Sequence, residues 1–278
     1  MTVRAFPRQR SAAALLATSA VLVAANSSGT DDWSSTLSRD PRGSFPDPRP
    51  LHAAYAFSWS GITAATAEVW FHRGEDSSFV LEGKGRTVGL ARVLWRFDVN
   101  YCSVVHSQTL RPIEVRQIEN VRSKRIETNL KFSNAGVTST RIETNRPKSS
   151  PKTFALANLN DLHSALIYVR SQPLRDGTVF RLAVYPANSA YVATMTVVGH
   201  ERVKVHAGTY SAIKLDLRLE RINKKNQLEP HRKFKRATAW VSDDNDRLLL
   251  RIEGQIFVGT IVTEIQSVRF DQPIAAIF

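Results

Sequence analysis

The stretch IKLDLRLE, residues 213–220, alternates an apolar side chain with a charged one at every step. Successive side chains of a β-strand point to opposite faces, so this period of two is typical of a half-buried strand. It predicts that Leu215 and Leu217 point inward and that Lys214 and Asp216 point outward. The run decides the fold class, because runs of the same kind recur along most of the chain.

Similar alternation appears on both sides of this stretch, at Ala67–Phe71, Val93–Val99, Tyr191–Val197, Leu248–Ile252 and Phe257–Ile265. Turn-forming residues separate the runs, at positions 74–76, 134–136, 207–208, 223–226 and 243–246. Many short strands with close turns predict an all-β, mainly antiparallel fold. We expect a large β-meander that curls into a barrel-like structure, because closure protects the edge strands.

One segment departs from the β period. Between positions 160 and 170 the apolar residues fall at helical spacing, namely Leu162, Ala165, Leu166 and Val169. Asn160 or Asp161 can cap the start of a helix, and Pro173 lies just beyond its end. The sequence therefore predicts one short helix near 161–170, between two groups of strands over 51–132 and 179–270.

The N-terminal residues have the layout of a secretory signal peptide. Three arginines, at positions 4, 8 and 10, precede an apolar and small-residue run over 11–25 that contains no acid. The run is short for a membrane span, so we expect cleavage after Ala25, with an uncleaved N-terminal anchor as the alternative. The mature chain would be periplasmic or secreted and would have no transmembrane segment, because no later stretch approaches the ~20 apolar residues of a spanning helix.

The remaining chain is predicted to form one domain. Residues 26–50 are rich in Ser, Asp, Pro, Arg and Gly, a composition typical of a flexible leader. A single β domain would follow over 51–272, with a short tail over 273–278. Cleavage would leave 278 − 25 = 253 residues, a length that suits one large all-β domain.

Four stretches occur in a recognisable order. They are 51–68, then DLHSALIYVR at 161–170 with PLRDG at 173–177, then VKVHAGTYSAIKL at 203–215, and finally 240–252. Together they resemble the DUF3108 family over residues 51–270, although the proline that this family often has near Leu249 is absent. The resemblance implies a bacterial envelope protein built as a barrel-like β-meander. It implies no established activity, so no catalytic residue is carried over.

No motif points to catalysis or to a bound metal or cofactor. The seven histidines show no H-x-x-x-H or H-E-x-x-H spacing, and no G-x-S-x-G turn is present. Cys102, the single cysteine, lies in a strand-like run and is predicted to be a small buried hydrophobe. We therefore predict no catalytic residue, no metal and no cofactor. A Ser–His pair that only the fold would bring together stays open as an alternative.

Three acids gather at Asp243, Asp244 and Asp246. Calcium prefers oxygen ligands of this kind, but the D-x-D-x-D-G loop is absent. A hairpin turn whose Asp side chains bond their own backbone explains the cluster more simply.

The chain is strongly basic, with 38 Lys and Arg against 25 Asp and Glu and a net charge of +13. Much of this charge lies in the segments 116–152 and 221–236. Lys224, Lys225, Arg232 and Lys233 of the second segment are candidate ligand-binding residues. In an exported chain they would attract an anionic glycan or lipid of the envelope rather than nucleic acid. Solvated loops and strand faces are the simpler alternative.

Three further residues are candidates for ligand binding. Arg236 and Trp240 would share one face of a strand with Phe234, where they could line a cleft or lie at the rim of the core. Arg170, near the end of the predicted helix, could bind a planar anion, but we favour a brace that bonds helix-end or strand carbonyls. Tyr168 is expected to pack over the adjoining sheet.

These features support three hypotheses. The first, which we favour, is a non-catalytic binding or accessory module for a lipid or anionic glycan of the cell envelope. The others are an enzyme that acts on an envelope polymer and a structural partner of a cell-surface assembly. An apolar cavity that opens beside arginines would favour the first, a converging Ser–His or Asp–Glu pair the second, and a large exposed apolar patch without a cavity the third.

Overall fold

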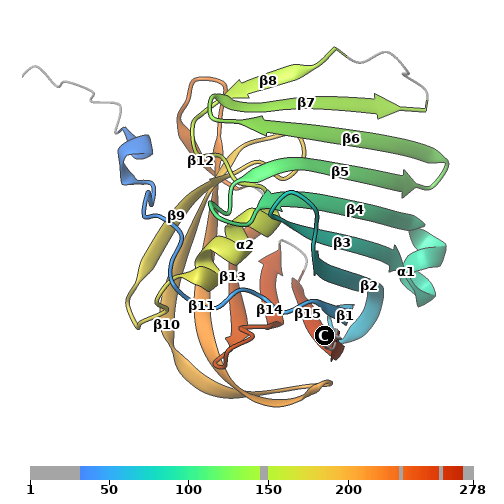
Figure 1. The fold of residues 1–278 in the computed structure, drawn as a ribbon. Coiled ribbons are helices and arrows are strands. Elements are labelled where there is room, and N and C mark those ends of the chain that lie inside the picture. Colours follow the sequence, from blue (N-terminus) through green and yellow to red (C-terminus); the bar gives the residue numbers. More distant parts are fainter. Residues whose placement is uncertain (1–31, 145–149, 232–233, 257–258, 272–278) are drawn as a thin grey trace, which may run out of the picture. The chain divides into compact units, whose positions relative to one another are not determined.

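The strands follow one another along the chain as a meander (Figure 1). The computed structural model describes residues 32–144, 150–231, 234–256 and 259–271. The predicted signal peptide and C-terminal tail lie outside these ranges, as do Arg232, Lys233 and Phe257. None of the described helices is long and apolar enough to cross a membrane.

Fifteen strands in the described ranges form one sheet, in which neighbouring strands are antiparallel. In chain order they are β1 (Leu51–Trp59), β2 (Ile62–Arg73), β3 (Ser78–Thr87), β4 (Phe97–His106), β5 (Pro112–Val121), β6 (Lys124–Ser133), β7 (Gly136–Glu143), β8 (Lys152–Ala155), β9 (Val179–Val184), β10 (Tyr191–Val205), β11 (Gly208–Ile222), β12 (Leu228–Pro230), β13 (Phe234–Ser242), β14 (Leu249–Ile256) and β15 (Gly259–Phe270). The predicted all-β, mainly antiparallel meander is confirmed.

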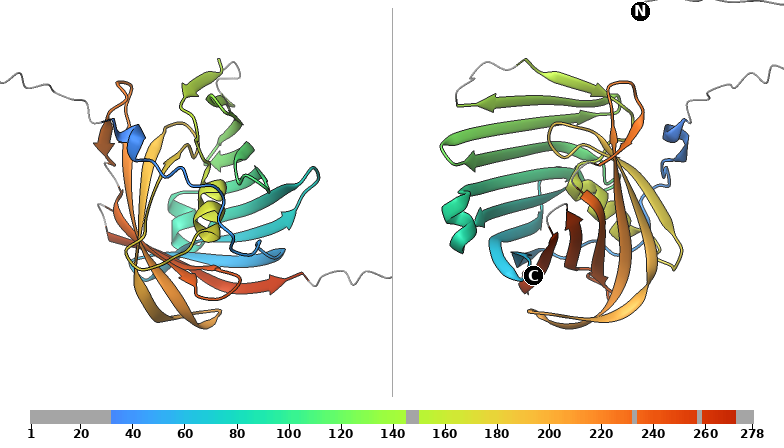
Figure 2. Two further views of the ribbon diagram at one scale, coloured as in Figure 1. Left: turned by 60° about the vertical axis from the view of Figure 1, so that its left-hand side comes forward. Right: turned by 180° about the vertical axis from the view of Figure 1, so that it is seen from behind.

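The sheet curls without closing. β1 pairs with both β2 and β15, which joins the first strand to the last. β8 and β9 remain at the two ends of the strand order. The two halves of the sheet therefore face each other across the helix α2 (Leu162–Ser171), which lies inside the curl (Figure 2).

The predicted helix is present, and Asp161 rather than Asn160 caps it. The Asp161 carboxylate accepts the Ser164 N–H at 2.7 Å, and the Ser164 hydroxyl accepts the Asp161 N–H at 3.0 Å, which forms a capping box. The expected buried stripe is only partly right, because Leu162 and Leu166 remain exposed. The sheet and the N-terminal segment enclose α2 on several sides, so its buried residues do not form a single stripe.

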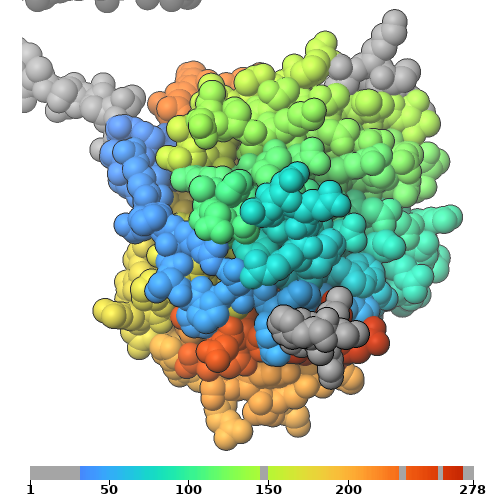
Figure 3. All heavy atoms as spheres, in the orientation of Figure 1, coloured from blue at the N-terminus to red at the C-terminus, as the bar shows by residue number. Residues whose placement is uncertain are grey.

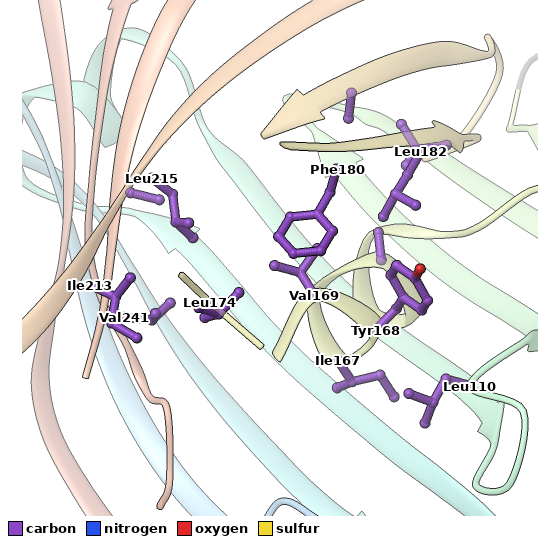
Figure 4. Close-up of a cluster of buried hydrophobic side chains, with 14 of the residues drawn as sticks. Leu110, Ile167, Tyr168, Val169, Leu174, Phe180, Leu182, Ile213, Leu215 and Val241 are labelled. Carbon is purple, nitrogen blue, oxygen red and sulfur yellow. The ribbon is translucent and has the colours of Figure 1, made fainter. Parts of the chain in front are cut away.

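The largest apolar cluster lies between α2 and the concave face of the sheet (Figure 4). Val169 and Tyr168 of α2 lie beside Phe180 and Leu182 of β9. Leu215 of β11 lies in the same cluster. Residues far apart in sequence therefore share one core.

The alternation at 213–220 is confirmed, although one of the outward charges is covered. Leu215 is buried and Leu217 packs against the same cluster. Asp216 lies on the other face but is only 7% exposed. Arg236 and Arg218 cover its carboxylate and pair with it, so a charge on the outer face need not be solvated.

The long β10–β11 hairpin bends back onto the sheet. A bulge at Gly199, where φ is +146°, interrupts the register and allows the bend. At the tip, the His206 N–H donates to the Glu264 Oε1 at 2.9 Å and the Ala207 N–H to the Ile265 carbonyl at 3.4 Å. A further apolar cluster, which includes Trp240, fills the space beneath this tip.

The predicted strand over Val93–Val99 begins later than expected. β4 starts at Phe97, and the residues before it form the short helix α1 (Gly89–Leu94). Leu90, Val93 and Leu94 are spaced i, i+3 and i+4, which is a helical stripe. The alternation of Val93 with Trp95 had suggested a strand in the same place.

Residues 33–50, called the strap below, differ most from expectation. The sequence predicted a flexible leader over 26–50, but the strap lies across the sheet and α2 (Figure 3). It opens with a 3₁₀ turn (Trp33–Thr36), and the buried Trp33 indole donates to the Asn226 carbonyl at 2.8 Å. At Gly43 an added Cβ would lie 2.0 Å from the Ser171 carbonyl oxygen, so only glycine allows this close approach.

Candidate functional site

An apolar cavity of about 310 Å³ lies inside the curl, between α2 and the first strands. Its walls come from the end of the strap, β1, β2, β3, α2, the β13–β14 turn, β14 and β15. Its larger apolar lining residues include Leu51, Tyr55, Phe57, Val69, Phe71, Leu81, Ile167, Leu249 and Ile252. Leu166 also lines it and is 38% exposed, which shows that the cavity opens to solvent beside α2.

Small inward-facing residues leave this space empty. Ala67 of β2 lines the cavity, and its cross-strand partners are Tyr55 and Gly85. One step along, Val69 faces Ala53 and Gly83. Glycine and alanine at inward positions prevent the tight filling that is usual in a protein core, so the cavity follows directly from the sequence of β1–β3.

One end of the cavity carries Arg170. Its guanidinium donates to three backbone carbonyls: Asp246 from Nε at 2.9 Å, Asn245 from Nη2 at 3.0 Å, and Pro46 from Nη1. Burial, and next the charge of Arg247, lower the pKa of Arg170 to about 10. The group is still charged at neutral pH. The predicted brace is only partly right: Arg170 bonds backbone carbonyls, but they belong to the strap and the β13–β14 turn and not to the helix end or a strand.

Arg247 lies beside Arg170 and also lines the cavity. Its guanidinium carbon is 3.4 Å from the centre of the Phe45 ring, a cation–π contact. Its Nη1 donates to the Gln172 carbonyl at 2.6 Å and to the Arg170 carbonyl. Two arginines and one carboxylate, that of Asp246, therefore lie at one end of a space whose other walls are mainly apolar.

A buried polar cluster adjoins the cavity at the start of α2. The Asp161 carboxylate accepts hydrogen bonds from the Tyr101 hydroxyl at 3.0 Å and from the Ser103 hydroxyl, and His163 Nδ1 lies 3.2 Å from the Ser103 oxygen. Ser103 is fully buried and donates directly to Asp161, so His163 does not stand between them as a base. The cluster fastens α2 to β4.

His163 gives the fold a pH dependence. Burial lowers its pKa from 6.5 to about 4, against the opposing charge of Asp161. Between these two values the unfolded chain binds a proton that the folded chain does not, so stability falls as the pH drops from 6.5 to 4. The shift corresponds to about 3 kcal/mol.

We expect His163→Phe to remove this part of the pH dependence. The measurement is urea unfolding of the parent and the variant from neutral pH down to pH 4, with His206→Phe, an exposed site, as control. A constant difference in unfolding free energy between parent and His163→Phe at every pH would contradict the assignment.

The structure distributes the other predicted site residues over separate places. Trp240 is buried, and its indole N–H donates to Glu201 Oε1 at 2.6 Å. Arg236 lies on the outer face in its ion pair with Asp216. Lys224 and Lys225 are exposed in the β11–β12 turn. None of these four lines the cavity, and Arg232 and Lys233 lie outside the described residues.

The acid cluster at 243–246 is a turn. Asp244 Oδ1 accepts the backbone N–H of Asp246 at 2.9 Å and of Arg247 at 3.1 Å, which is the turn chemistry expected from the sequence. Among the described residues no group of three or more His, Cys, Asp and Glu side chains could hold a metal ion. Cys102 is half-buried, and burial raises the pKa of its thiol.

A second hollow, of about 590 Å³, lies along the strap. Residues 38–44 form one side and the β4–β5 turn, 108–111, the other. Its walls mix charged, polar and apolar groups, and it follows the seam between strap and sheet. The smaller cavity has the more uniform lining and is therefore the better candidate site.

Sequence reasoning found Arg170 but missed Arg247, His163 and the cavity itself. A signal for the cavity was present: Gly83 and Gly85 stand two positions apart in one strand-like run, and Ala67 is a small residue in the run before it. Arg247 carried no such signal, because it reaches the site only through the β13–β14 turn.

Fold and site together define a class of protein: a curled antiparallel β-meander that holds one buried helix and an apolar cavity beside it. The chain belongs to the DUF3108 family, described as a protein of unknown function, whose sequence profile matches residues 54–266. No curated protein matches the chain.

Solved structures resemble the fold at very low sequence identity. A beta-barrel-like protein of the domain of unknown function DUF1849 from Brucella abortus superposes with a TM-score of 0.59 at 8% identity, over 82% of this chain and 100% of that one. A protein from Parabacteroides distasonis, provisionally described as a lipoprotein, gives a TM-score of 0.36 at 8% identity, over 83% of this chain and 100% of that one. The first comparison supports the barrel-like fold.

Proposed function

We propose that this protein is a non-catalytic binding module that takes the apolar chain of an envelope lipid into its cavity. The observation that carries the proposal is the cavity of about 310 Å³ with its apolar walls. This volume lies at the lower end of the range for small-molecule sites. Water gains little in such a space because it finds few hydrogen-bond partners, whereas an acyl chain fills it favourably.

The two arginines suit an anionic or polar headgroup. Arg170 uses three of its five N–H groups on the carbonyls named above, which leaves donors for a ligand at the same end of the cavity. A glycan would satisfy these donors but not the apolar walls. The combination therefore favours a lipid over an anionic glycan.

The signal-like N-terminus supports an envelope lipid as the source of the ligand. A chain exported to the periplasm, or beyond it, meets membrane lipids and lipid precursors of the envelope. The lipid class is best read from the protein itself, by native mass spectrometry of material purified from its own envelope.

Filling the cavity tests the proposal. Ala67→Phe places a ring among the lining residues, and we expect it to weaken binding of a dansyl-labelled undecanoic acid at least about tenfold, a loss of about 1.4 kcal/mol. Thr66→Phe is the matched control, because the neighbouring residue points to the opposite face of β2. Fluorescence titration gives both dissociation constants.

Three results would count against a lipid site. The parent could fail to bind the probe, the two phenylalanine variants could bind it equally, or protein from the native envelope could carry no lipid. Circular dichroism of both variants establishes that each retains the β-sheet, so lost binding cannot be attributed to unfolding.

A further inference from the structure

Exposed apolar side chains occur where strands β1–β4 begin or end, around the helix α1. Figure 1 shows how α1 projects from these strand ends. We call this the α1 edge and define it by Trp59, Ile62, Leu90, Val93, Leu94 and Trp95. These side chains are between 49% and 83% exposed. They are six of the twelve exposed large hydrophobic residues in the described ranges, so the concentration at a single edge is not the usual scatter of single surface hydrophobes.

In the helix α1 the apolar side chains face solvent and the charged side chain faces the protein. Its apolar stripe of Leu90, Val93 and Leu94 faces solvent, and none of its residues is buried. Its arginine turns back instead: Arg92 bonds Asp98 through both Nη atoms, at 2.9 and 3.3 Å, and the Thr87 carbonyl at 3.2 Å. A helix on a water-facing surface would normally present these groups the other way round.

A basic fringe surrounds the apolar residues. The segments 86–98 and 122–125 contain six basic residues and one acid, Asp98, so their net charge is 6 − 1 = +5. Arg86, Arg96, Arg122 and Lys124 are all exposed. Arg122 lies over the Trp95 ring at 4.5 Å and so joins the fringe to the apolar residues.

We propose that the α1 edge docks on the surface of an anionic lipid bilayer. Leucine, valine and tryptophan side chains would enter the boundary between headgroups and acyl chains, and the arginines would meet the lipid phosphates. Charge selects this occupant: a net charge of +5 repels a second copy of the same edge and attracts acidic lipid.

The position of the edge agrees with this orientation. Phe57 lines the cavity, and Trp59, two residues further along β1, belongs to the α1 edge. Docking would therefore bring one end of the cavity close to the membrane. The docking proposal stands without the cavity proposal, because the exposed apolar and basic residues do not depend on any ligand.

Sedimentation with lipid vesicles tests the proposal on the full chain. We expect binding to vesicles of phosphatidylcholine with phosphatidylglycerol, weak binding to phosphatidylcholine alone, and loss of binding at high salt. Leu90→Gln with Leu94→Gln should weaken binding about tenfold or more, because two apolar anchors are removed while a good helix former is kept. Residues 1–25 are the same in every variant, so differences report on the edge.

Two matched controls separate the edge from general effects. Val179→Gln with Val198→Gln removes two exposed apolar residues elsewhere and should leave binding unchanged. Arg122→Gln with Lys124→Gln should weaken binding about tenfold at low salt, whereas Arg202→Gln with Lys204→Gln, an equal loss of charge on β10, should have a much smaller effect.

Specific outcomes would overturn the proposal. Equal binding of the parent and the Leu90, Leu94 variant would do so, and so would equal binding to charged and uncharged vesicles. A dimer in sedimentation velocity that the same variant dissociates would identify the edge as a protein interface instead. Ala67→Phe should bind vesicles like the parent, which keeps failure of the cavity proposal distinct from failure of docking.

Discussion

Asp161→Ala is expected to lower the free energy of unfolding by about 3–5 kcal/mol, the usual result of removing one partner from a buried, fully paired polar group. The carboxylate holds the Ser164 N–H at 2.7 Å and the Tyr101 hydroxyl at 3.0 Å, together with the Ser103 hydroxyl. Without it α2 loses its N-cap, and two hydroxyl groups of β4 lose their acceptor.

Urea unfolding followed by tryptophan fluorescence measures this loss. Asp161→Asn should fall between parent and Ala variant, because the amide oxygen still accepts one N–H whereas its NH₂ group cannot accept a hydroxyl. Asp176→Ala, an exposed acid, is the control and should change stability by at most about 0.5 kcal/mol. A loss below about 1 kcal/mol for Asp161→Ala would show that the cluster does not hold the helix.

Arg170→Ala is expected to cost about 3–5 kcal/mol as well, because three carbonyls from two loops lose a charged donor. Arg170→Lys should recover little, since one ammonium group cannot reach three carbonyls in the fork geometry of a guanidinium. The strap should loosen first, because Pro46 loses its bond to the helix. Trypsin should then cut faster after Arg39 and Arg42 than it does in the parent.

Arg202→Ala is the matched control, since this arginine lies exposed on β10. Its unfolding free energy and its tryptic pattern should follow those of the parent. A different result would reassign Arg170: unchanged stability and strap cleavage together with lost fatty-acid binding would make it a ligand residue instead of a brace.

The repeated part of the fold was predictable from the sequence. Alternation at 213–220 and in the related runs identified strands, and the turn residues identified their ends. Asn160 or Asp161 at the start and Pro173 beyond the end bounded α2, because capping and proline chemistry are local. Each of these signals depends on neighbours within a few residues.

Features that depend on distant partners were not predictable. Asp216 was expected to point outward and does so, but its cover by Arg236 across the strand pair could not be predicted. The strap has the composition of a leader, yet Trp33 reaches Asn226, which is 193 positions away. The composition of a segment indicates how well its side chains are solvated on average. It does not indicate which surface of the fold the segment packs against.

One part of the candidate site was predictable from local sequence signals, and the other part depends on strand pairing between distant residues. Arg170 could be named as a candidate from the sequence because an arginine at a helix end has few roles, and bonding to backbone carbonyls is one of them. The cavity required the register of β1, β2 and β3 to be known, since only the pairing of Ala67 with Gly85 and of Val69 with Gly83 shows that small residues lie together.

The strap also determines when the fold can be completed. It comes before every strand in the chain, but it docks on residues that follow much later: Gln172 bonds Pro41 across 131 positions and Trp33 bonds Asn226 across 193. Closing such long loops has an entropic cost that only the finished sheet and helix can offset. Docking of Trp33 and Pro41 therefore requires the β11–β12 turn and the end of α2 to be in place, and a chain truncated before the β11–β12 turn would have no partner for Trp33.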